Sequence, residues 1–354
     1  MKLTILTNIY PTSKHPDSGT YVSDQVRSLT PFVETKVINK SQRSAIGFVP
    51  FGLKTLWNLL TEKHDIVHAH YGFHSAILAV LLGRKPLVVT FHGSDALIEP
   101  KRNRLYRLFQ KRVVASASRI IAVSDHIKQE LVHNLGADSR KICVLPCGVD
   151  TERFRFRSKG EARKRLGLRD DMKLALFIGR LSRAKGVDLI KKASERLPDL
   201  NFYFIGTGPI KWHAPNCEFV GTVDHESIPQ WINSADVLTL PSRSEGTPVT
   251  VLEALASEVP VICSDVGACS EIVLENRTGR LIPPGDAEAL SGAIKYVFSW
   301  NAFDSKTARQ MVVEKYDLNV LSEKLLRLYE EVLETKNGRT LQASVAEMNR
   351  KRSF

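Results

Sequence analysis

The chain lacks the features that mark membrane-spanning, disulfide-linked and metal-holding proteins. The apolar run at 76–82 is seven residues long, whereas a helix needs about 20 residues to cross a bilayer. The five cysteines include no Cys-x-x-Cys pair, and no Asp-x-Asp motif is present to hold a metal ion. The first residues are typical of a strand rather than a signal peptide, because no small-residue cleavage site follows. We therefore expect a cytoplasmic protein with reduced thiols and no bound metal.

The charge is basic and unevenly distributed. The 354 residues carry a formal net charge of +12, and they suffice for two domains with sizeable cores. Residues 1–150 hold 20 Lys and Arg against 11 Asp and Glu, while the rest of the chain holds 30 against 27. The positive excess therefore belongs to the first half, which indicates an anionic partner there, either a membrane surface or an acidic acceptor.

Short apolar strands alternate with helical patterns along the chain. In the first half we expect strands at 2–7, 35–38, 66–69, 87–91, 120–123 and 142–145, and helices at 22–29, 73–82, 101–115 and 125–135. In the second half we expect strands at 174–178, 201–205, 217–220, 237–240 and 261–264, and a helical end from about 286 to 335. This alternation predicts an α/β fold with parallel sheets, which bind ligands at the carboxyl ends of their strands.

The chain divides at a basic segment without apolar period. Residues 150–160 indicate a linker, because four cations occur there outside any helical or strand pattern. We expect an N-terminal domain at 1–155, a C-terminal domain at 156–335 and a flexible tail at 336–354. A cleft between the two domains follows from this organisation.

The segment 241–256 carries the strongest chemical signal. Glu245 lies in a Gly/Pro loop, and Glu253 lies eight positions later in a helix that begins near Pro248. The start of such a helix attracts phosphate, and an ionised carboxylate can accept hydrogen bonds from both hydroxyls of a vicinal diol. Together they suit a nucleotide sugar. The competing interpretation is a loop acid followed by an ordinary surface acid near a helix start.

Two cations follow the expected strand at 174–178. Arg180 and Lys185 come after a glycine at the carboxyl end of that strand, where they would face the cleft. Two fixed cations can neutralise a departing diphosphate without a metal, Arg as a fork and Lys as a point charge. Arg183 is a weaker candidate. A solvated basic loop is the alternative.

A second group of candidates is rich in histidine. His92 follows the expected strand at 87–91, and Asp95 would either orient it or cap the next helix. His68, His70 and His74 have no carboxylate or cysteine nearby to complete a metal site. We interpret these three as core packing or acceptor contacts.

These residues form a recognisable set. The chain resembles the retaining glycosyltransferases of family 4, which have the GT-B fold of two facing Rossmann-like domains with a central interdomain cleft. The resemblance covers nearly all of 1–335. Its motifs are Gly-Arg-Leu at 179–181 with Lys-Gly at 185–186, Glu-x7-Glu at 245–253, Phe-His-Gly-Ser-Asp at 91–95 and Leu-Pro-Cys-Gly-Val-Asp at 145–150. The N-terminal Tyr10–Gln25 segment is similar to a branch that builds bacterial envelope polysaccharides.

The resemblance implies roles for particular residues. Glu245 would hold the transferred sugar, Glu253 the ribose diol, and His92 would lie near the acceptor with Asp95 beside it. Backbone groups would complete the donor site, at Gly19 for the phosphates, at Gly206 and Val223 for the base, and at Gly246, Thr247, Pro248, Val249 and Thr250 around the helix start. No cofactor is implied. The C-terminal helices would pack back toward the N-terminal domain.

The expected activity is transfer of a sugar, with retained configuration, from a UDP- or GDP-sugar to a glycan or lipid-linked acceptor. A GT-B nucleotide-sugar epimerase is one alternative, and a basic nucleic-acid-binding protein is the other. The latter needs aromatic residues among its exposed cations. The basic segment Lys101–Arg112 could instead lie on an anionic membrane, at the inner face of the cell membrane, or be a solvated helix face.

Overall fold

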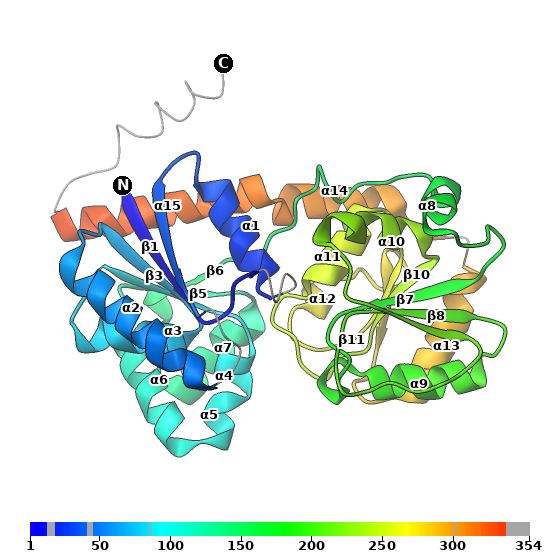
Figure 1. The fold of residues 1–354 in the computed structure, drawn as a ribbon, viewed down its shortest axis with the longest axis horizontal. Coiled ribbons are helices and arrows are strands. Elements are labelled where there is room, and N and C mark those ends of the chain that lie inside the picture. The colour runs from blue at the N-terminus through cyan, green and yellow to red at the C-terminus, as the bar shows by residue number, and fades with distance from the viewer. Residues whose placement is uncertain (13–17, 41–44, 85, 301, 338–354) are drawn as a thin grey trace, which may run out of the picture.

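The structure is a computed structural model that describes residues 1–12, 18–40, 45–84, 86–300 and 302–337. It contains two six-stranded sheets whose strand pairs are all parallel, side by side along the long axis of the molecule (Figure 1). The α/β fold with two facing sheets is therefore confirmed. The GT-B arrangement is the one that the sequence motifs indicated.

The first sheet has the strand order β2-β1-β3-β4-β5-β6. Its strands are β1 (Lys2–Thr7), β2 (Glu34–Asn39), β3 (Ile66–His70), β4 (Leu87–Phe91), β5 (Arg119–Ala122) and β6 (Ile142–Val144). The central strands β3 and β4 are buried along their whole length, as strands covered on both faces are, although β3 includes His68 and His70. Each expected strand in this half is present to within a residue or two at its ends.

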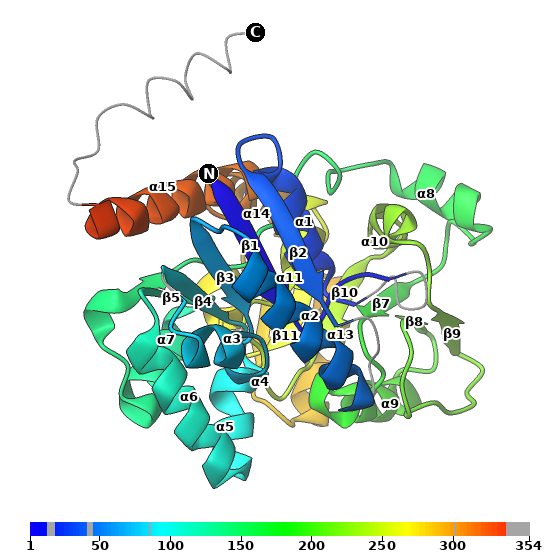
Figure 2. The ribbon, with the colours of Figure 1, turned by 60° about the vertical axis from the view of Figure 1, so that its left-hand side comes forward.

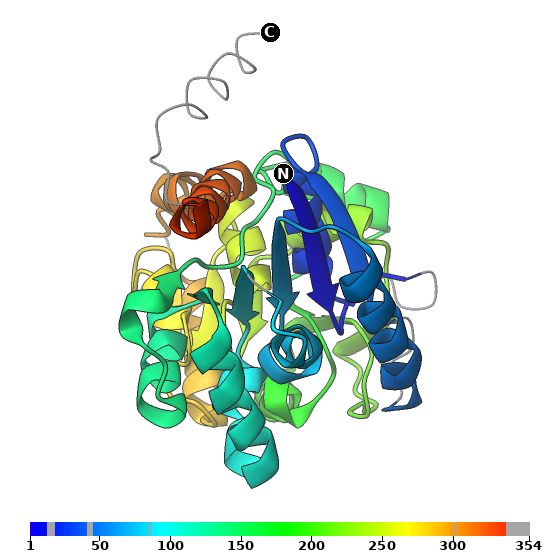
Figure 3. The same ribbon diagram turned by 90° about the vertical axis from the view of Figure 1, so that its left-hand side faces the viewer.

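Helices cover both faces of this sheet. One face carries α2 (Phe48–Thr61), α3 (Gly72–Leu81), α6 (Arg104–Ser116) and α7 (Asp125–Leu135), with the short helices α4 (Ser94–Leu97) and α5 (Glu99–Arg102) beside them. The opposite face carries α1 (Thr20–Leu29) and the C-terminal helix α15 (Leu318–Asn337). Figure 3 shows the red C-terminal helix above the sheet and the cyan helices below it.

The second sheet has the order β12-β11-β10-β7-β8-β9. Its strands are β7 (Leu174–Ile178), β8 (Asn201–Ile205), β9 (Cys217–Gly221), β10 (Val237–Leu240), β11 (Val261–Ser264) and β12 (Gly279–Ile282). Its helices are α8 (Lys159–Leu166), α9 (Val187–Arg196), α10 (Ile228–Ser234), α11 (Val249–Ala256), α12 (Cys269–Ile272), α13 (Ala287–Phe298) and α14 (Ser305–Tyr316). One apolar core joins these elements.

The chain passes between the two sheets twice, and the two passes lie side by side. The Val149 N–H donates to the Tyr316 carbonyl at 2.9 Å, and the Leu318 N–H donates to the Val149 carbonyl at 3.0 Å. After the second pass, α15 returns to the first sheet, where Tyr329 and Leu325 are buried among its apolar side chains. Figure 2 shows α14 and α15 spanning the two halves.

Several elements differ from the sequence expectations. The helix expected over 101–115 is broken at Asn103, whose side chain caps α6 by accepting from the Leu105 and Tyr106 N–H groups. The linker expected over 150–160 is shorter, because Ser158 caps α8. Helix α2 and strand β12 were not expected at all. The expected tail begins inside α15, and residues 338–354 lie outside the described residues.

No helix in the described part of the chain combines the length and apolar character needed to cross a bilayer.

Candidate active site

A cleft of about 980 Å³ lies between the carboxyl ends of the two sheets. From the first half it is lined by Asn8, Thr20, Tyr21, Tyr71, His92 and Gly93, and from the second by Gly179, Arg180, Lys185, Gly206, Val223, His225, Glu253 and the whole segment from Glu245 to Thr250. The site residues assigned a role from the sequence all line this cleft except Gly19 and Asp95, and the weaker candidate Arg183 does not line it. The structure therefore gathers these residues at one place, as doubly wound sheets do with their ligand-binding loops.

The Glu245 carboxylate is buried and paired with Lys185. The Lys185 Nζ donates to Oε1 at 2.7 Å and to Oε2 at 2.9 Å. Lys185 lies at the end of a short 3-10 helix. Gly186 follows it in the left-handed region, and a Cβ there would also meet the Pro241 carbonyl oxygen at 1.9 Å, so this position requires glycine. The sequence predicted phosphate contact for Lys185 and sugar contact for Glu245, without predicting that they bind each other.

A second ion pair fixes this loop, and sequence reasoning missed it. The Arg243 guanidinium donates to both carboxylate oxygens of Asp188 at 2.8 Å, and its backbone N–H donates to the Ala184 carbonyl at 2.8 Å. This bidentate pair joins the loop before Glu245 to the start of α9. The only available signal was an acid in the first turn of a helix, which many helices have.

The loop after Glu245 touches the first half of the molecule. A Cβ on Gly246 would meet the His92 carbonyl oxygen at 1.9 Å, so only glycine permits this approach. The Thr247 hydroxyl donates to the Val123 carbonyl at 2.7 Å and accepts from the Cys147 N–H at 3.3 Å. One loop therefore carries the acid of the second sheet to the histidine of the first.

Helix α11 begins at the cleft and carries the second acid. Pro248 is its N-cap and makes no side-chain capping bond, so the first-turn N–H groups of Val249 and Thr250 remain open toward the cleft. Glu253 is 6% exposed, and its Oε1 lies 3.9 Å from the His225 Nε2. Burial raises the pKa of Glu253 above its ordinary value, with His225 opposing that shift.

Other predicted residues shape the cleft on the side of the second sheet. Arg180 is exposed and has no hydrogen-bond or ion-pair partner among the residues that the structure describes. Gly206 has a φ of 125°, and a Cβ there would meet the Gly179 carbonyl oxygen at 2.1 Å, so no side chain fits at this position. Val223 is half-buried in the cleft wall. Arg180 therefore presents an uncommitted guanidinium to the cleft.

On the opposite side, three histidines stack. The His68 and His70 rings lie 4.4 Å apart, and the His70 Nδ1 is 3.0 Å from the His92 Nε2. Burial lowers the pKa of His70 to about 3 and holds the pKa of His92 well below its usual range. His92 is thus a neutral imidazole at the cleft surface. His68 is bonded to the Tyr329 hydroxyl at 2.6 Å, as core packing predicts.

The described residues contain no group of three His, Cys, Asp or Glu side chains that could hold a metal ion. His74 stands apart from the stack, against the Phe48 ring and 3.8 Å from a Glu99 oxygen.

Asp95 and Gly19 support the cleft from behind. Asp95 is fully buried and accepts from the backbone N–H groups of Gly72, His92 and Gly93 at 3.0–3.1 Å. It therefore holds the backbone and not the imidazole, contrary to one of the two expectations. Gly19 begins α1 with φ of 67°, and a Cβ there would meet the Ile9 carbonyl oxygen at 2.8 Å. Its neighbours Ser18 and Thr20 line the cleft.

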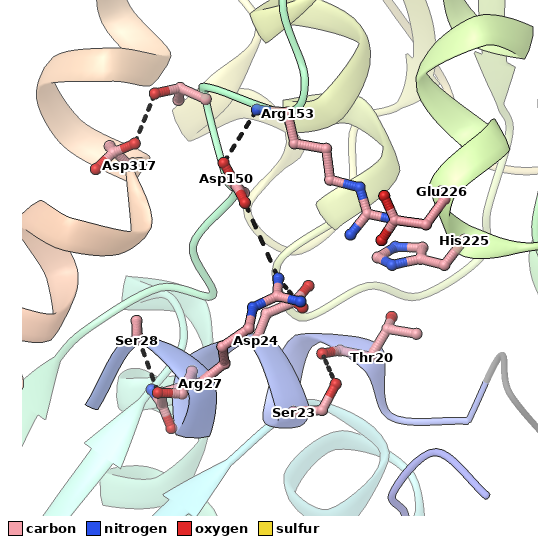
Figure 4. Close-up of polar contacts among 12 residues, drawn as sticks. Thr20, Ser23, Asp24, Arg27, Ser28, Asp150, Arg153, His225, Glu226 and Asp317 are labelled. Carbon is pink, nitrogen blue, oxygen red and sulfur yellow. Dashed lines mark hydrogen bonds and ion pairs between the residues drawn. The ribbon is translucent and has the colours of Figure 1, made fainter. Parts of the chain in front are cut away.

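A charged cluster lies around His225, which lines the cleft and faces Glu253. Arg153, from the segment between the sheets, reaches toward His225 and Glu226 of the second half, and Asp24 of α1 lies below them (Figure 4). The Arg153 side chain is 10% exposed, and its Nη2 lies 3.1 Å from a Glu226 oxygen in an ion pair that leaves Nε and Nη2 without hydrogen-bond acceptors. Burial raises the pKa of Asp24.

Comparisons with known proteins agree with this geometry. Residues 13–153 match the model of Glycosyltransferase Family 4, and residues 158–315 match that of Glycosyl transferases group 1. The putative teichuronic acid biosynthesis glycosyltransferase TuaC of Bacillus subtilis is 39% identical over 239 residues, which cover 65% of this chain. The match spans 60% of that relative's length, less than two thirds.

Two solved structures are similar in fold. Sucrose-phosphate synthase from Thermosynechococcus elongatus has a TM-score of 0.80 at 18% identity, covering 95% of this chain and 100% of that one. HepE from Anabaena, in complex with UDP, has a TM-score of 0.76 at 16% identity, covering 94% and 100%. At such identities the likeness concerns the fold alone.

The contact at Gly246 predicts a specific sensitivity. Gly246→Ala places a methyl group against the His92 carbonyl, so we expect the free energy of unfolding to fall by about 1–3 kcal/mol and the cleft to widen. Gly292→Ala is the matched control, because nothing lies within 4 Å of a Cβ on that exposed position of α13. It should stabilise by roughly 0.5–1 kcal/mol. Chemical denaturation measures both, and equal stability of the two variants would contradict the contact.

The raised pKa of Glu253 predicts a pH dependence of stability. The contribution of Glu253 to the free energy of unfolding is fully present below the pKa of Glu in the unfolded chain. It is lost as the pH rises through the raised pKa of the folded state. Gln cannot ionise, so Glu253→Gln should gain stability relative to the parent as the pH rises above the unfolded Glu value of about 4.3. Glu195→Gln, at an exposed position of α9, is the control and should show no such trend. Melting temperatures measured as a function of pH test it, and parallel curves for parent and variant would exclude the shift.

Proposed function

Because the chain belongs to glycosyltransferase family 4, with the GT-B fold, we propose that it transfers a sugar from a nucleotide-sugar donor to a hydroxyl of an acceptor. The observation that carries this proposal is the convergence of Glu245, Glu253, Lys185 and Arg180 on one cleft beside the open start of α11. The donor is a UDP- or GDP-sugar, and the transferred sugar keeps its anomeric configuration. HepE binds UDP, which supports a nucleotide-bearing donor.

The acceptor is a glycan or a lipid-linked glycan of cell-envelope polysaccharide synthesis. The name of TuaC, which assigns it to teichuronic acid biosynthesis, supports this part of the proposal. The acceptor would enter from the side of the first sheet, where Tyr21, Tyr71 and His92 line the cleft. The neutral His92 imidazole can accept or donate a hydrogen bond to a sugar hydroxyl there.

The donor diphosphate would lie between Arg180, Lys185 and the start of α11. Arg180 is free to form a bidentate contact, and the open N–H groups of α11 favour negative charge. These fixed groups would neutralise the charge that develops as the diphosphate departs. We therefore expect the transfer reaction to need no metal ion and to persist in the presence of a chelator.

Each acid has a distinct place in this arrangement. Lys185 occupies one direction at each Glu245 oxygen, and a carboxylate with about four lone-pair directions can still accept sugar hydroxyls. Glu253 would accept from the ribose diol, whose hydroxyls compensate for the burial that now raises its pKa.

No side chain of the described cleft is poised as a nucleophile. Burial raises the pKa of the Cys147 thiol to about 12, so it carries a proton at neutral pH. Both oxygens of Glu245 are held by Lys185. We therefore favour a front-face displacement, in which the leaving phosphate oxygen takes the proton of the acceptor hydroxyl. Catalysis then depends on positioning and electrostatics.

The geometry does not favour nucleic-acid binding. That function needs exposed aromatic rings among the cations of α6, but Tyr106 is buried and Phe109 stacks on Phe73 at 5.1 Å. An epimerase would turn over the donor in the absence of an acceptor.

A thermal-shift screen against UDP-, GDP- and ADP-sugars tests the donor. A ligand at 100 times its dissociation constant adds about 2.7 kcal/mol to the free energy of unfolding, so one base should raise the melting temperature distinctly. The selected donor is then incubated with and without glycan acceptors. Transfer with retained configuration supports the proposal, whereas interconversion of the donor sugar without an acceptor indicates an epimerase, and no shift with any donor contradicts it.

Removing Glu245 or Lys185 should abolish most of the transfer. We expect Glu245→Ala and Lys185→Ala each to lower kcat by about 10²–10³-fold, and the double variant to lose little more than the worse single variant because the two groups act as a unit. Circular dichroism should show a retained fold. Glu195→Ala is the control on the exposed face of α9. Full activity in Glu245→Ala, or additive losses, would refute the assigned roles.

A further inference from the structure

Helix α2 carries apolar side chains on both of its faces. Phe51 and Leu59 point into the core of the first domain. On the opposite side of the helix lie exposed apolar side chains, with Trp57 71% exposed and Leu53 63% exposed. This outer stripe consists of Ile46, Val49, Leu53, Trp57 and Leu60. The inner face also buries Thr55 and Asn58, so the exposed apolar side chains of the outer stripe are the unusual feature of this helix, and a contiguous exposed apolar stripe indicates a docking surface.

Unpaired cations lie at α2 itself and, across α3, on α6. Lys54 is the only charged residue of α2. Exposed basic side chains without a hydrogen-bond or ion-pair partner in the described part of the chain form what we call the basic rim: Lys54 and Lys63 at α2, and Arg104, Lys111 and Arg112 on α6. Five of the 20 Lys and Arg of residues 1–150 thus carry free charge on this side of the first domain.

Two acids near these helices, Glu62 and Glu130, are paired with cations outside the basic rim, whereas Glu99 of α5 faces His74 at 3.8 Å. Glu62, which follows α2, pairs with Lys36. Glu130 of α7 pairs with Lys101 at 3.2 Å. The basic rim therefore acts as uncompensated positive charge toward any partner, and the partner that complements it is anionic.

The outer stripe and the basic rim lie on one side of the first domain. Helices α2 and α6 both pack against α3, and all three cover the same face of the sheet. Figures 1 and 2 show them on that side. Exposed Leu81 of α3 and Leu105 and Leu108 of α6 continue the apolar surface toward the cations.

This side of the molecule adjoins the cleft. Phe48, the first residue of α2, stacks against the His74 ring, and the Lys40 Nζ lies 3.8 Å from the centre of the Phe48 ring. Lys40 also lines the cleft. A ligand held at the basic rim could therefore extend into the cleft along the N-terminal end of α2.

We infer that the outer stripe and the basic rim dock this protein on an anionic lipid bilayer. A tryptophan among aliphatic side chains, bordered by Lys and Arg, matches the boundary between acyl chains and anionic headgroups. A second copy of the chain is a poorer occupant, since it would place its own basic rim against this one. The inference rests on the proposed function in one respect: docking would bring the cleft to a lipid-linked acceptor.

The segment from which the sequence predicted membrane contact takes a smaller part. Helix α6 buries Tyr106, Gln110 and Val113, and its exposed side carries three of the rim cations together with Leu105 and Leu108. It supplies most of the charge, while α2 supplies most of the apolar contact.

Vesicle flotation of the full chain tests the inference. We compare vesicles of phosphatidylcholine alone with vesicles in which about a third of the lipid is phosphatidylglycerol. The protein should float with the anionic vesicles, less so at high salt, and only weakly with the neutral ones. Leu53→Asp and Trp57→Asp should each lower binding at least about tenfold, because a charge replaces an inserted apolar group. The control is Phe156→Asp, at an exposed phenylalanine in the second half of the chain, which should bind like the parent.

Charge reversal of the rim is the second arm. Lys111→Glu combined with Arg112→Glu should weaken binding to anionic vesicles by at least about fivefold per cation. The binding that remains should depend less on salt. Equal binding by the parent and the two α2 variants would overturn the inference. So would a parent that is a dimer by analytical ultracentrifugation and becomes monomeric in Trp57→Asp, since a second copy would then cover the stripe.

Donor binding in solution separates this inference from the proposed function. The α2 variants should keep the donor-induced rise in melting temperature of the parent, which also shows that they fold. Flotation without any donor binding would leave docking in place and remove the proposed function. Donor binding and transfer without flotation would support the proposed function and overturn the docking inference.

Discussion

The two side-by-side passages of the chain between its sheets are the constraint on which the rest of the structure depends. Val149 pairs with Tyr316 and Leu318 through backbone hydrogen bonds, and the Thr151 hydroxyl donates to Asp317 at 2.6 Å. Arg309 adds donors to the carbonyls of Thr151, Phe154 and Ala256. Because both passages are tied to each other, the two sheets present their carboxyl ends to one shared cleft, and α15 is committed to the first sheet.

The electrostatics of the cleft follow from this closeness. Loops of one sheet desolvate acids of the other, and a buried carboxylate is stable only with compensating charge or hydrogen bonds. Glu245 has Lys185 as its compensation. Glu253 has only His225 at 3.9 Å, so burial dominates its pKa. Arg180 and the N–H groups at the start of α11 carry full or partial positive charge that no acid of the described residues pairs with. Glu253 can therefore accept hydrogen bonds from hydroxyl groups, and Arg180 with the start of α11 can bind an anion; the nucleotide sugar that we propose as donor carries both kinds of group.

The sequence predicted the strands well because parallel strands buried on both faces are continuous apolar runs, as Leu87–Phe91 and Leu174–Ile178 show. It also predicted most of the cleft lining, because loops at the carboxyl ends of such strands must converge. It could not predict contacts set by tertiary distance. The Lys185–Glu245 pair joins residues 60 positions apart, and Arg243–Asp188 joins residues 55 positions apart. The bond that Asp95 accepts from the Gly72 N–H, 23 positions away, was out of reach for the same reason.

Helix α2 shows a more general limit of reading periodicity. An amphipathic pattern identifies a helix that has one apolar face, which is why the basic segment at 101–112 drew attention. Helix α2 carries apolar side chains on its exposed side as well as on its buried side, which weakens the contrast between its two faces. In α2, Pro50 and Gly52 weaken the helical signal further. The helix with the stronger reason to contact a membrane is therefore the one whose sequence pattern is least informative, and only the exposure of Leu53 and Trp57 in the folded domain distinguishes it from a core helix.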